Sequence, residues 1–151
     1  MTDKWDKRWF QIAEVISWWS KDPSTKIAAI AIKDKRLIST GYNGFPRGIQ
    51  DTDERWNNKE EKYRRVVHAE MNCIYNANYH NQSLRGATMY IIGLPVCHEC
   101  AKGIIQVGVK RVVAKYDSVP MKWSKSNEIT ENMFKEAGVI YDKVRSKGNR
   151  E

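Results

Sequence analysis

The sequence predicts an α/β fold in which helices flank a five-stranded mixed sheet, an arrangement of three α/β/α layers. Two observations support this prediction. Segments with apolar residues at helical spacing alternate with short runs of β-branched and aromatic residues along most of the chain. Their order is one helix, two strands and then three helix–strand units. Right-handed crossovers within such units would make the last three strands mutually parallel.

The first part of the chain predicts one helix and one hairpin. The helix is expected over residues 4–20. Its apolar stripe consists of Trp5, Trp9, Ile12, Ile16 and Trp19. Such a tryptophan-rich stripe is typical of a core or of a subunit interface. Two β-type runs at 27–33 and 37–42 indicate a hairpin. A turn-rich loop follows at 43–48, and polar, irregular sequence continues to about residue 65.

The second part predicts three helices that alternate with strands. The helices are expected at 68–78, 97–107 and 126–137. The strands are expected at 87–93, 109–116 and 139–144. Because no linker or internal repeat interrupts this pattern, we expect a single domain. It covers residues 1–151, with its core at about 5–144 and a basic tail at 145–151.

The composition excludes several classes of protein. Hydrophobic residues make up 41% of the 151 residues, which is typical of a globular chain and not of a disordered one. No apolar run approaches the ~18 residues of a membrane span, and the N-terminus lacks the profile of a signal peptide. We therefore expect no membrane partner and a cytoplasmic location, or the host cytoplasm if the chain is viral. The formal charge of +8 suits nucleic acid and phosphorylated small molecules alike.

Three candidate metal ligands stand at the starts of two predicted helices. His68 begins one helix, and Cys97 and Cys100 begin the next. Zn²⁺ prefers imidazole nitrogen and thiolate sulfur, and a catalytic site uses three protein ligands and leaves the fourth position to water. Zinc lowers the pKa of that water from near ~16 to near ~7. Glu70 is not needed as a ligand and is free to transfer protons.

Other interpretations of these residues remain open. A Cys-x-x-Cys pair can be a redox dithiol or half of a structural zinc site, but His80 and His98 lack the context of a fourth ligand. A zinc-binding interaction module without catalysis would not need Glu70 at its position. Cys73 is expected to be a buried apolar thiol. The catalytic interpretation predicts one zinc per subunit.

Five motifs together resemble those of a known family. They lie at residues 20–26, 39–48, 68–72, 97–102 and 105–109. Through them the chain resembles the zinc-dependent cytidine/deoxycytidylate deaminase superfamily, and within it the phage-type deoxycytidylate (dCMP) deaminases. The combination of Ser-Lys-Asp-Pro with Gly-Tyr-Asn-Gly-x-Pro is what favours the dCMP branch. The resemblance implies a three-layer, cytidine-deaminase-like fold.

The resemblance also implies a reaction, which is the hydrolytic deamination of dCMP to dUMP and ammonia. This reaction would supply dUMP for dTMP synthesis. His68, Cys97 and Cys100 would hold the zinc. Glu70 would protonate N3 of cytosine and then the departing amino group.

A second set of residues is implied in substrate binding. It consists of Ser20, Lys21, Ser24, Lys26, Asn43, Ala69 and Tyr116. Lys21 and Lys26 would meet the phosphate together with nearby hydroxyls. Asn43 would bond the deoxyribose, the backbone of Ala69 would contact the pyrimidine, and Tyr116 would stack on it. Without the resemblance, residues 20–26 are an ordinary turn and Tyr116 is an ordinary aromatic residue at the end of a strand.

The resemblance implies regulation as well, with dCTP as activator and dTTP as inhibitor, each bound with Mg²⁺. The implied effector site comprises Gly44, Phe45, Arg47 and Gly48. Arg47 would be available to the effector phosphates. From the residues alone, this segment is a Gly/Pro-rich turn with an exposed arginine. Homohexamers are the common assembly of this branch.

One residue departs from the family pattern. Val96 stands between Pro95 and Cys97, where the family usually has proline directly before the cysteine. We expect a small bulge to absorb the additional residue. The alternative enzyme is a nucleic-acid adenosine or cytidine deaminase, which applies the same zinc chemistry to a flipped-out or single-stranded base. The dCMP-type loop at 41–48 argues against it, and we expect no nucleic-acid partner.

Overall fold

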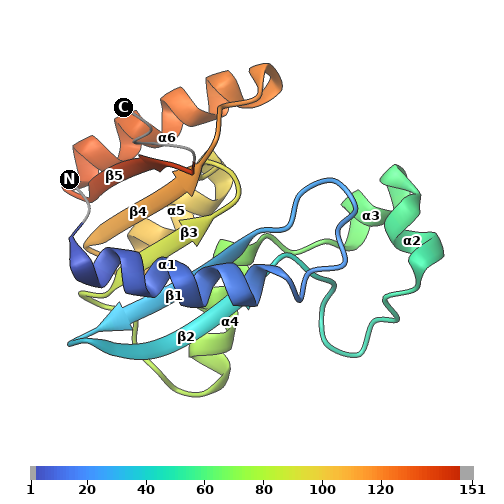
Figure 1. Ribbon diagram of the computed structural model, residues 1–151, viewed down its shortest axis with the longest axis horizontal. Helices are drawn as coiled ribbons and strands as arrows, with labels where there is room; N and C mark the ends of the chain where they lie inside the picture. Colours follow the sequence, from blue (N-terminus) through green and yellow to red (C-terminus); the bar gives the residue numbers. More distant parts are fainter. Residues whose placement is uncertain (1–2, 147–151) are drawn as a thin grey trace.

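The computed structural model describes residues 3–146 and contains a five-stranded sheet with the order β2-β1-β3-β4-β5 (Figure 1). The strands are β1 (Ala28–Lys33), β2 (Arg36–Tyr42), β3 (Thr88–Ile92), β4 (Arg111–Tyr116) and β5 (Ile140–Arg145). The longer helices are α1 (Lys4–Ser17), α4 (Ala69–Tyr79), α5 (His98–Gln106) and α6 (Ser124–Ala137). The shorter ones are α2 (Asp53–Asn57), α3 (Lys59–Arg65) and a 3₁₀ turn at Met121–Trp123.

The topology confirms the predicted mixed sheet. β1 pairs antiparallel with β2 and β3, whereas β3, β4 and β5 are mutually parallel. One face of the sheet is covered by α1, and the other by α4, α5 and α6 (Figure 1). No helix within residues 3–146 is both long and apolar enough to cross a membrane. Of the predicted basic tail, Arg145 ends β5, and residues 147–151 lie outside the described part of the chain.

The first helix is shorter than predicted. It ends at Ser17, whereas the sequence pattern extends to residue 20. The backbone N–H groups of Trp18, Trp19 and Ser20 each bond to the carbonyl three residues back. This bonding tightens the chain into turns of the 3₁₀ type after the last α-helical residue.

The prediction of irregular sequence up to residue 65 was wrong, because α2 and α3 lie within it. Side-chain oxygens cap both helices: Thr52 accepts from the N–H of Arg55 at 3.3 Å, and Asn58 accepts from the N–H of Glu61 at 3.2 Å. α3 also has an acidic first turn and a basic last turn, which suits the helix dipole. The cap-and-glutamate spacing at 58–61 is a recognisable start signal, but helices this short leave no apolar periodicity to accompany it.

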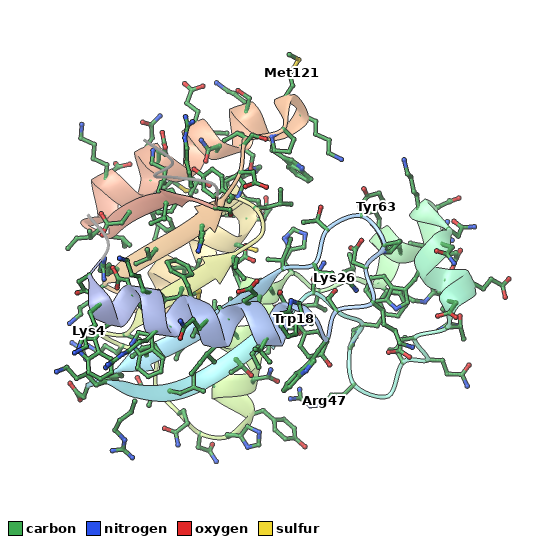
Figure 2. The ribbon with its side chains drawn as sticks, in the orientation of Figure 1. Lys4, Trp18, Lys26, Arg47, Tyr63 and Met121 are labelled. Atoms are coloured by element: carbon green, nitrogen blue, oxygen red, sulfur yellow. The ribbon has the colours of Figure 1, made fainter. Side chains whose placement is uncertain are left out.

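The tryptophan stripe of α1 coincides only in part with the face that packs on the sheet. The buried hydrophobic residues of this helix are Phe10, Ala13 and Ile16, which pack against β1, β3 and β4. Trp18 and Trp19 are 64% and 58% exposed, and Figure 2 shows Trp18 just beyond the end of the helix. Of the predicted stripe, Ile16 is buried and Trp9 packs against the core, whereas Ile12 and Trp19 are exposed, so only part of the stripe is core.

A buried carboxylate fixes the rotation of α1 about its axis. Asp6 accepts a hydrogen bond from the Tyr90 hydroxyl at 2.6 Å and pairs with Arg111 at 2.8 Å. Arg111 also pairs with Asp142 of β5 at 2.9 Å. Burial alone would raise the pKa of Asp6, but the hydrogen bonds from Arg111 and Tyr90 outweigh it and lower that pKa. Because a buried charge without its partners is costly, other rotations of α1 are disfavoured.

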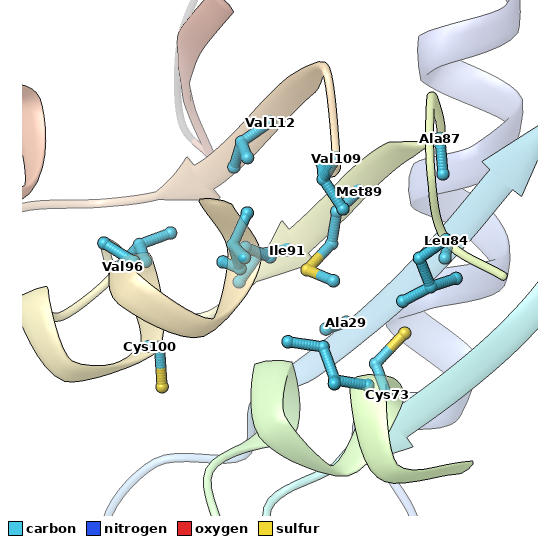
Figure 3. Packing of buried hydrophobic residues seen from close by; sticks show 14 of the residues in the cluster. Ala29, Cys73, Leu84, Ala87, Met89, Ile91, Val96, Cys100, Val109 and Val112 are labelled. Carbon is cyan, nitrogen blue, oxygen red and sulfur yellow. The ribbon is translucent and has the colours of Figure 1, made fainter. Parts of the chain in front are cut away.

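The core on the opposite face joins the sheet to the helices that carry the metal ligands. Met89, Ile91 and Val112 project from β3 and β4 into this core, and Val96 and Cys100 enter it beside α5 (Figure 3). Cys73 of α4 is fully buried in the same cluster, as predicted.

α4 lies very close to β2 at Gly41. A Cβ added to Gly41 would lie 2.3 Å from the backbone nitrogen of Cys73 and 2.4 Å from the carbonyl oxygen of Ala69. The Ser39 hydroxyl, on the same strand, donates to the Cys73 carbonyl at 2.7 Å. These contacts hold the first turn of α4, and His68 immediately before it, against the end of β2.

Gly41→Ala is expected to destabilise the protein by about 1–3 kcal/mol, because backbone atoms of α4 cannot rotate away from the added methyl group. Displacement of α4 should also lower the zinc content of the purified protein. Thermal unfolding and metal analysis measure both effects. Gly44→Ala is the control for stability, since a Cβ there meets no atom closer than 3.4 Å. Equal unfolding temperatures for the two variants would contradict the close approach at Gly41.

One end of the sheet gathers the residues of the site. Ala28, the first residue of β1, is the register partner of Tyr42 and Ile92, the last residues of β2 and β3. β4 runs parallel to β3 and ends at the same edge. In open α/β sheets, ligands bind outside the carboxyl ends of parallel strands. α4 and α5 both begin at this edge.

Candidate active site

Three ligand atoms converge where α4 and α5 begin. His68 is the residue before α4, Cys97 caps α5, and Cys100 lies in the first turn of α5. The Nδ1 atom of His68 lies 3.3 Å from the sulfur of Cys100 and 3.5 Å from the sulfur of Cys97. All three ligand atoms lie within 4.8 Å of one another, and no second group of this kind occurs among the described residues.

These distances fit a tetrahedral zinc ion. Zn–N and Zn–S bonds of ~2.1 and ~2.3 Å at the tetrahedral angle place nitrogen and sulfur ~3.6 Å apart. The observed separations of 3.3 and 3.5 Å are close to this value. One imidazole and two thiols are also the ligand types that zinc prefers, and three protein ligands leave a position open for catalysis.

Mutual hydrogen bonds prepare the three ligands for a metal. A hydrogen bond from Cys100, and with smaller effect one from His68, lowers the pKa of Cys97 to about 4. The bond to Cys97 raises the pKa of His68 to about 8, against the effect of burial. Donation to Cys97, together with burial, raises the pKa of Cys100 above its usual range. Without metal, the two cysteines therefore share one proton near neutral pH, and His68 carries another.

Glu70 lies beside these ligands and is not one of them. Its side chain belongs to the first turn of α4, is only 4% exposed and lines the same cavity as His68 and Cys97. Burial raises the pKa of Glu70, although the positive charge of His68 opposes the shift. A raised pKa makes the carboxylate a stronger proton acceptor than an exposed one, which suits a group that takes up a proton and returns it.

The additional residue before Cys97 enters the core. Val96 is fully buried, its N–H donates to the Tyr141 hydroxyl at 3.3 Å, and its carbonyl accepts from the Thr130 hydroxyl at 2.9 Å. β5 and α6 thus hold the backbone just ahead of the first cysteine. Burial raises the pKa of Tyr141, so its hydroxyl stays protonated.

A cavity of about 320 Å³ opens at the metal ligands. This volume lies within the range of small-molecule sites. Its apolar wall includes Ile27, Val66 and Leu94, which suit the faces of a planar ring. Of the residues that the sequence implicated, its lining contains Ser24, Asn43, His68, Glu70 and Cys97.

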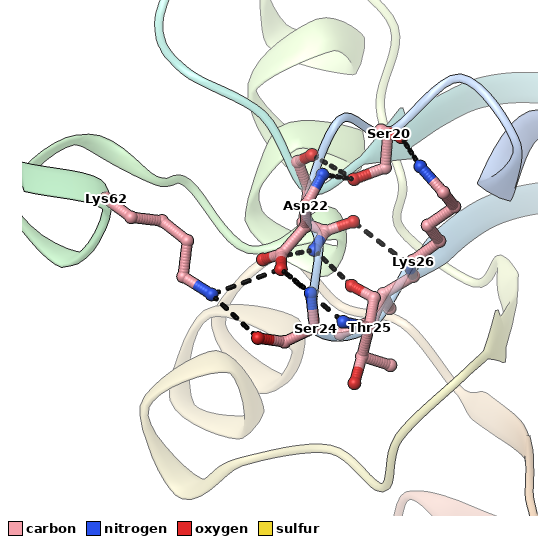
Figure 4. Close-up of polar contacts among 8 residues, drawn as sticks. Ser20, Asp22, Ser24, Thr25, Lys26 and Lys62 are labelled. Carbon is pink, nitrogen blue, oxygen red and sulfur yellow. Dashed lines mark hydrogen bonds and ion pairs between the residues drawn. The ribbon is translucent and has the colours of Figure 1, made fainter. Parts of the chain in front are cut away.

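Other implicated residues do not line this cavity. The Ser20 hydroxyl donates to the backbone carbonyl of Asn43 at 2.8 Å. Lys21 pairs with Asp51 at 3.3 Å, and the ammonium of Lys26 donates to the Ser20 carbonyl (Figure 4). Ala69 and Tyr116 are buried, at the start of α4 and at the end of β4. The two lysines therefore contact protein groups outside the cavity.

The structure adds lining residues that the sequence did not indicate. From α3 come Lys62 and Tyr63, and from the segment that starts α6 come Lys122, Trp123 and Asn127. The buried Oδ1 atom of Asn127 has no hydrogen-bond partner among the described residues. No local pattern distinguishes these residues, because their position depends on contacts across the fold.

A second cavity, of about 470 Å³, lies beside the loop at 43–48. Its lining contains Gly44, Phe45 and Arg47 but not Gly48. The Arg47 guanidinium donates to the Asn76 side chain and lies 4.3 Å from the centre of the Tyr79 ring.

Backbone hydrogen bonds connect this loop to the segment that carries His68. Gly44 and Val67 exchange two hydrogen bonds of 3.2 and 2.8 Å. Asn43 lines the first cavity and Gly44 the second, while Val67 directly precedes His68.

A three-layer fold with a His/Cys/Cys group beside a buried carboxylate defines a zinc-dependent enzyme. The family model described as "Cytidine and deoxycytidylate deaminase zinc-binding region" matches residues 3–116. The chain belongs to this family.

Individual relatives agree with this assignment. An uncharacterised deaminase of Aliivibrio fischeri is 39% identical over 92% of each chain. The human deoxycytidylate deaminase is 34% identical over 93% of this chain and 79% of its own length. The dCMP deaminase of cyanophage S-TIM5, solved in complex with dCMP and dUMP, has the same fold. Its TM-score is 0.75 at 23% identity, with 95% of this chain and 99% of that chain covered.

Proposed function

We propose that this enzyme hydrolyses dCMP to dUMP and ammonia, and so supplies dUMP for dTMP synthesis. The observation that carries the proposal is the buried Glu70 beside three zinc ligands in a cavity large enough for a nucleotide. The relatives named deoxycytidylate deaminase and the cyanophage enzyme solved with dCMP and dUMP support the choice of substrate.

The proposed roles of the residues follow from their positions. His68, Cys97 and Cys100 hold the zinc, which when bound supplies a water of pKa near ~7 and therefore a nucleophile at neutral pH. Glu70 would accept a proton from the attacking water and deliver it to N3 of cytosine. After the new C4–O bond forms, Glu70 passes a proton from the oxygen to the amino group. The C4–N bond then breaks, and ammonia leaves.

Asn43 has one hydrogen-bonding position free for the sugar, and that position is an acceptor. Its amide N–H groups donate to Asp22 at 3.2 Å and to the Thr25 carbonyl at 2.9 Å, which uses both donors. Its Oδ1 atom accepts from the N–H of Ile27 at 2.9 Å and keeps one lone pair. Asn43 therefore accepts from a deoxyribose hydroxyl and cannot donate to it.

Ammonia release is the test of the proposed reaction. It should be measured with dCMP, dCTP, deoxycytidine and tRNA, with and without Mg·dCTP or Mg·dTTP. We expect dCMP to be the preferred substrate. Absence of dCMP turnover under every condition would refute the proposal, and turnover of tRNA alone would favour a nucleic-acid deaminase.

We also propose that the second cavity binds the effectors dCTP and dTTP with Mg²⁺. Its volume of about 470 Å³ and the guanidinium of Arg47 suit a nucleoside triphosphate. The bonds between Gly44 and Val67 offer a route by which an effector would shift Asn43 and His68.

Arg47→Ala is expected to raise the dCTP concentration for half-maximal activation by about tenfold or more, because a charge-assisted contact to phosphate is lost. Titration of dCMP turnover with Mg·dCTP gives this concentration. Arg64→Ala removes an exposed arginine that does not line the cavity. This variant should leave the dCTP concentration for half-maximal activation unchanged. An unaltered titration of the Arg47 variant would place the effector elsewhere.

We further propose a homohexamer in the cytoplasm. The exposed Trp18 and Trp19 provide apolar surface for subunit contacts, and Cys73, Cys97 and Cys100 are free thiols, which suits a reducing compartment. Light scattering of the zinc-loaded protein measures the mass of the assembly.

A further inference from the structure

A nearly buried lysine lines the catalytic cavity. Only 5% of the Lys62 side chain is exposed, yet the residue belongs to the cavity lining. Its ammonium lies 3.1 Å from an Asp22 carboxylate oxygen and 3.4 Å from the Ser24 hydroxyl (Figure 4). The ammonium also lies 5.1 Å from the centre of the Tyr63 ring, which lines the same cavity. Because an ammonium has three N–H donors, the two hydrogen bonds leave one that a ligand in the cavity can accept.

Among the described residues, the lysines and arginines that line this cavity are Lys62 and Lys122. Lys122 is exposed and contacts protein through the Trp123 ring, whose centre lies 5.4 Å from its ammonium. Lys62, in contrast, is already held by Asp22 and Ser24. A fixed side chain loses less rotamer entropy when it binds a ligand than an exposed one does. Lys62 is therefore the better prepared of the two cations for an anionic group.

The carboxylate beside Lys62 accepts from four donors in all. Besides the ammonium, Asp22 accepts from the N–H groups of Ser24 and Thr25 at 2.8 and 3.4 Å, and from the Asn43 amide at 3.2 Å. These donors offset its repulsion of a second anion. They also tie Lys62 and Asn43 to one group, so that the cation stands at a fixed position relative to the residue proposed to bind the sugar.

We infer that Lys62, together with the hydroxyls of Ser24 and Thr25, binds the 5′-phosphate of the substrate and thereby distinguishes a nucleotide from a nucleoside. This inference rests on the proposed function. In this inference Lys62 takes the place of Lys21 and Lys26 as the phosphate contact. The ammonium groups of those two lysines contact Asp51 and the Ser20 carbonyl, outside the cavity. Lys62 is a specificity-determining residue and takes no part in the proton transfers.

The test compares dCMP with deoxycytidine as substrates of the zinc-loaded Lys62→Gln enzyme. Glutamine keeps an N–H donor for Asp22 but removes the charge. We expect kcat/KM for dCMP to fall about 10- to 100-fold and that for deoxycytidine to change less than about threefold. Lys59→Gln is the matched control, since Lys59 is exposed on the same helix and does not line the cavity. It should keep the wild-type preference for dCMP.

Three results would overturn the inference. The first is an unchanged preference for dCMP in Lys62→Gln, and the second is its loss in Lys122→Gln instead. The third is an equal fall for both substrates, which would mean that Lys62 only neutralises Asp22. Calorimetric binding of dUMP and deoxyuridine by the same variants gives a readout that does not require turnover. If the wild-type enzyme deaminates neither substrate, the proposed function fails. A selective loss of dUMP binding in Lys62→Gln would still support the phosphate contact.

Discussion

Glu70→Gln is expected to lower kcat/KM for dCMP by about 10²- to 10⁴-fold while one zinc per chain stays bound. Glutamine has nearly the same shape but cannot take a proton from water and return it to the base. Because Glu70 is buried and not among the three ligand atoms, its replacement removes proton transfer without removing a metal ligand. Removal of its ionisable group from a buried site should also leave the unfolding temperature equal to or above that of the wild type.

Single-turnover measurements with dCMP, combined with metal analysis, check this result. Glu14→Gln removes an exposed carboxylate from α1 and serves as the control, with kcat/KM expected near that of the wild type. If Glu70→Gln kept more than about a tenth of wild-type activity, another group would have to move the protons. Loss of zinc from this variant would show instead that Glu70 supports the metal.

Removal of zinc is expected to abolish activity altogether, and Cys97→Ala should bring about the same loss. A chelator removes the metal from the wild-type protein, and added Zn²⁺ should restore its turnover but not that of the variant. Cys73→Ala is the control, because this buried thiol lies outside the three-ligand group. Turnover by metal-free wild-type protein would contradict a zinc enzyme.

Zinc uptake should release about two protons at pH 7, because zinc binds deprotonated ligands. One proton comes from His68, whose pKa is about 8 in the metal-free protein. The other comes from Cys100, whose pKa is raised, whereas Cys97, with a pKa of about 4, has already lost its proton. As the pH rises through about 8, His68 becomes neutral and the release falls toward one. Calorimetry of zinc binding in buffers with different ionisation enthalpies counts these protons.

The zinc site was predictable because each half of it is local in sequence. His68 and Glu70 are two residues apart at one helix start, and Cys97 and Cys100 are three apart at another. β2 and β3, which precede these two helices, both run antiparallel to β1 and end at the same edge of the sheet, and this brings the two helix starts together.

The proposed phosphate contact was not predictable in this way. Lys62 meets Asp22 across forty residues of chain, through a short helix that has no apolar periodicity. Lys21 and Lys26 stand in the family motif, but their ammonium groups contact Asp51 and the Ser20 carbonyl, neither of which lines the cavity. The sequence also could not predict which face of α1 packs on the sheet, because this depends on the pairing of Asp6 with Arg111.

The contacts of Val96 bear on how far the chain can be truncated at its C-terminal end. The family model ends at residue 116, yet the loop before Cys97 is held by Thr130 and Tyr141, which lie beyond that point. The segment after residue 116 also supplies Lys122 and Trp123 to the cavity. A fragment that ends at residue 116 would keep the three metal ligands and Glu70. It would lack Thr130 and Tyr141, which hold the backbone before Cys97. We therefore expect an active fragment to extend beyond residue 116.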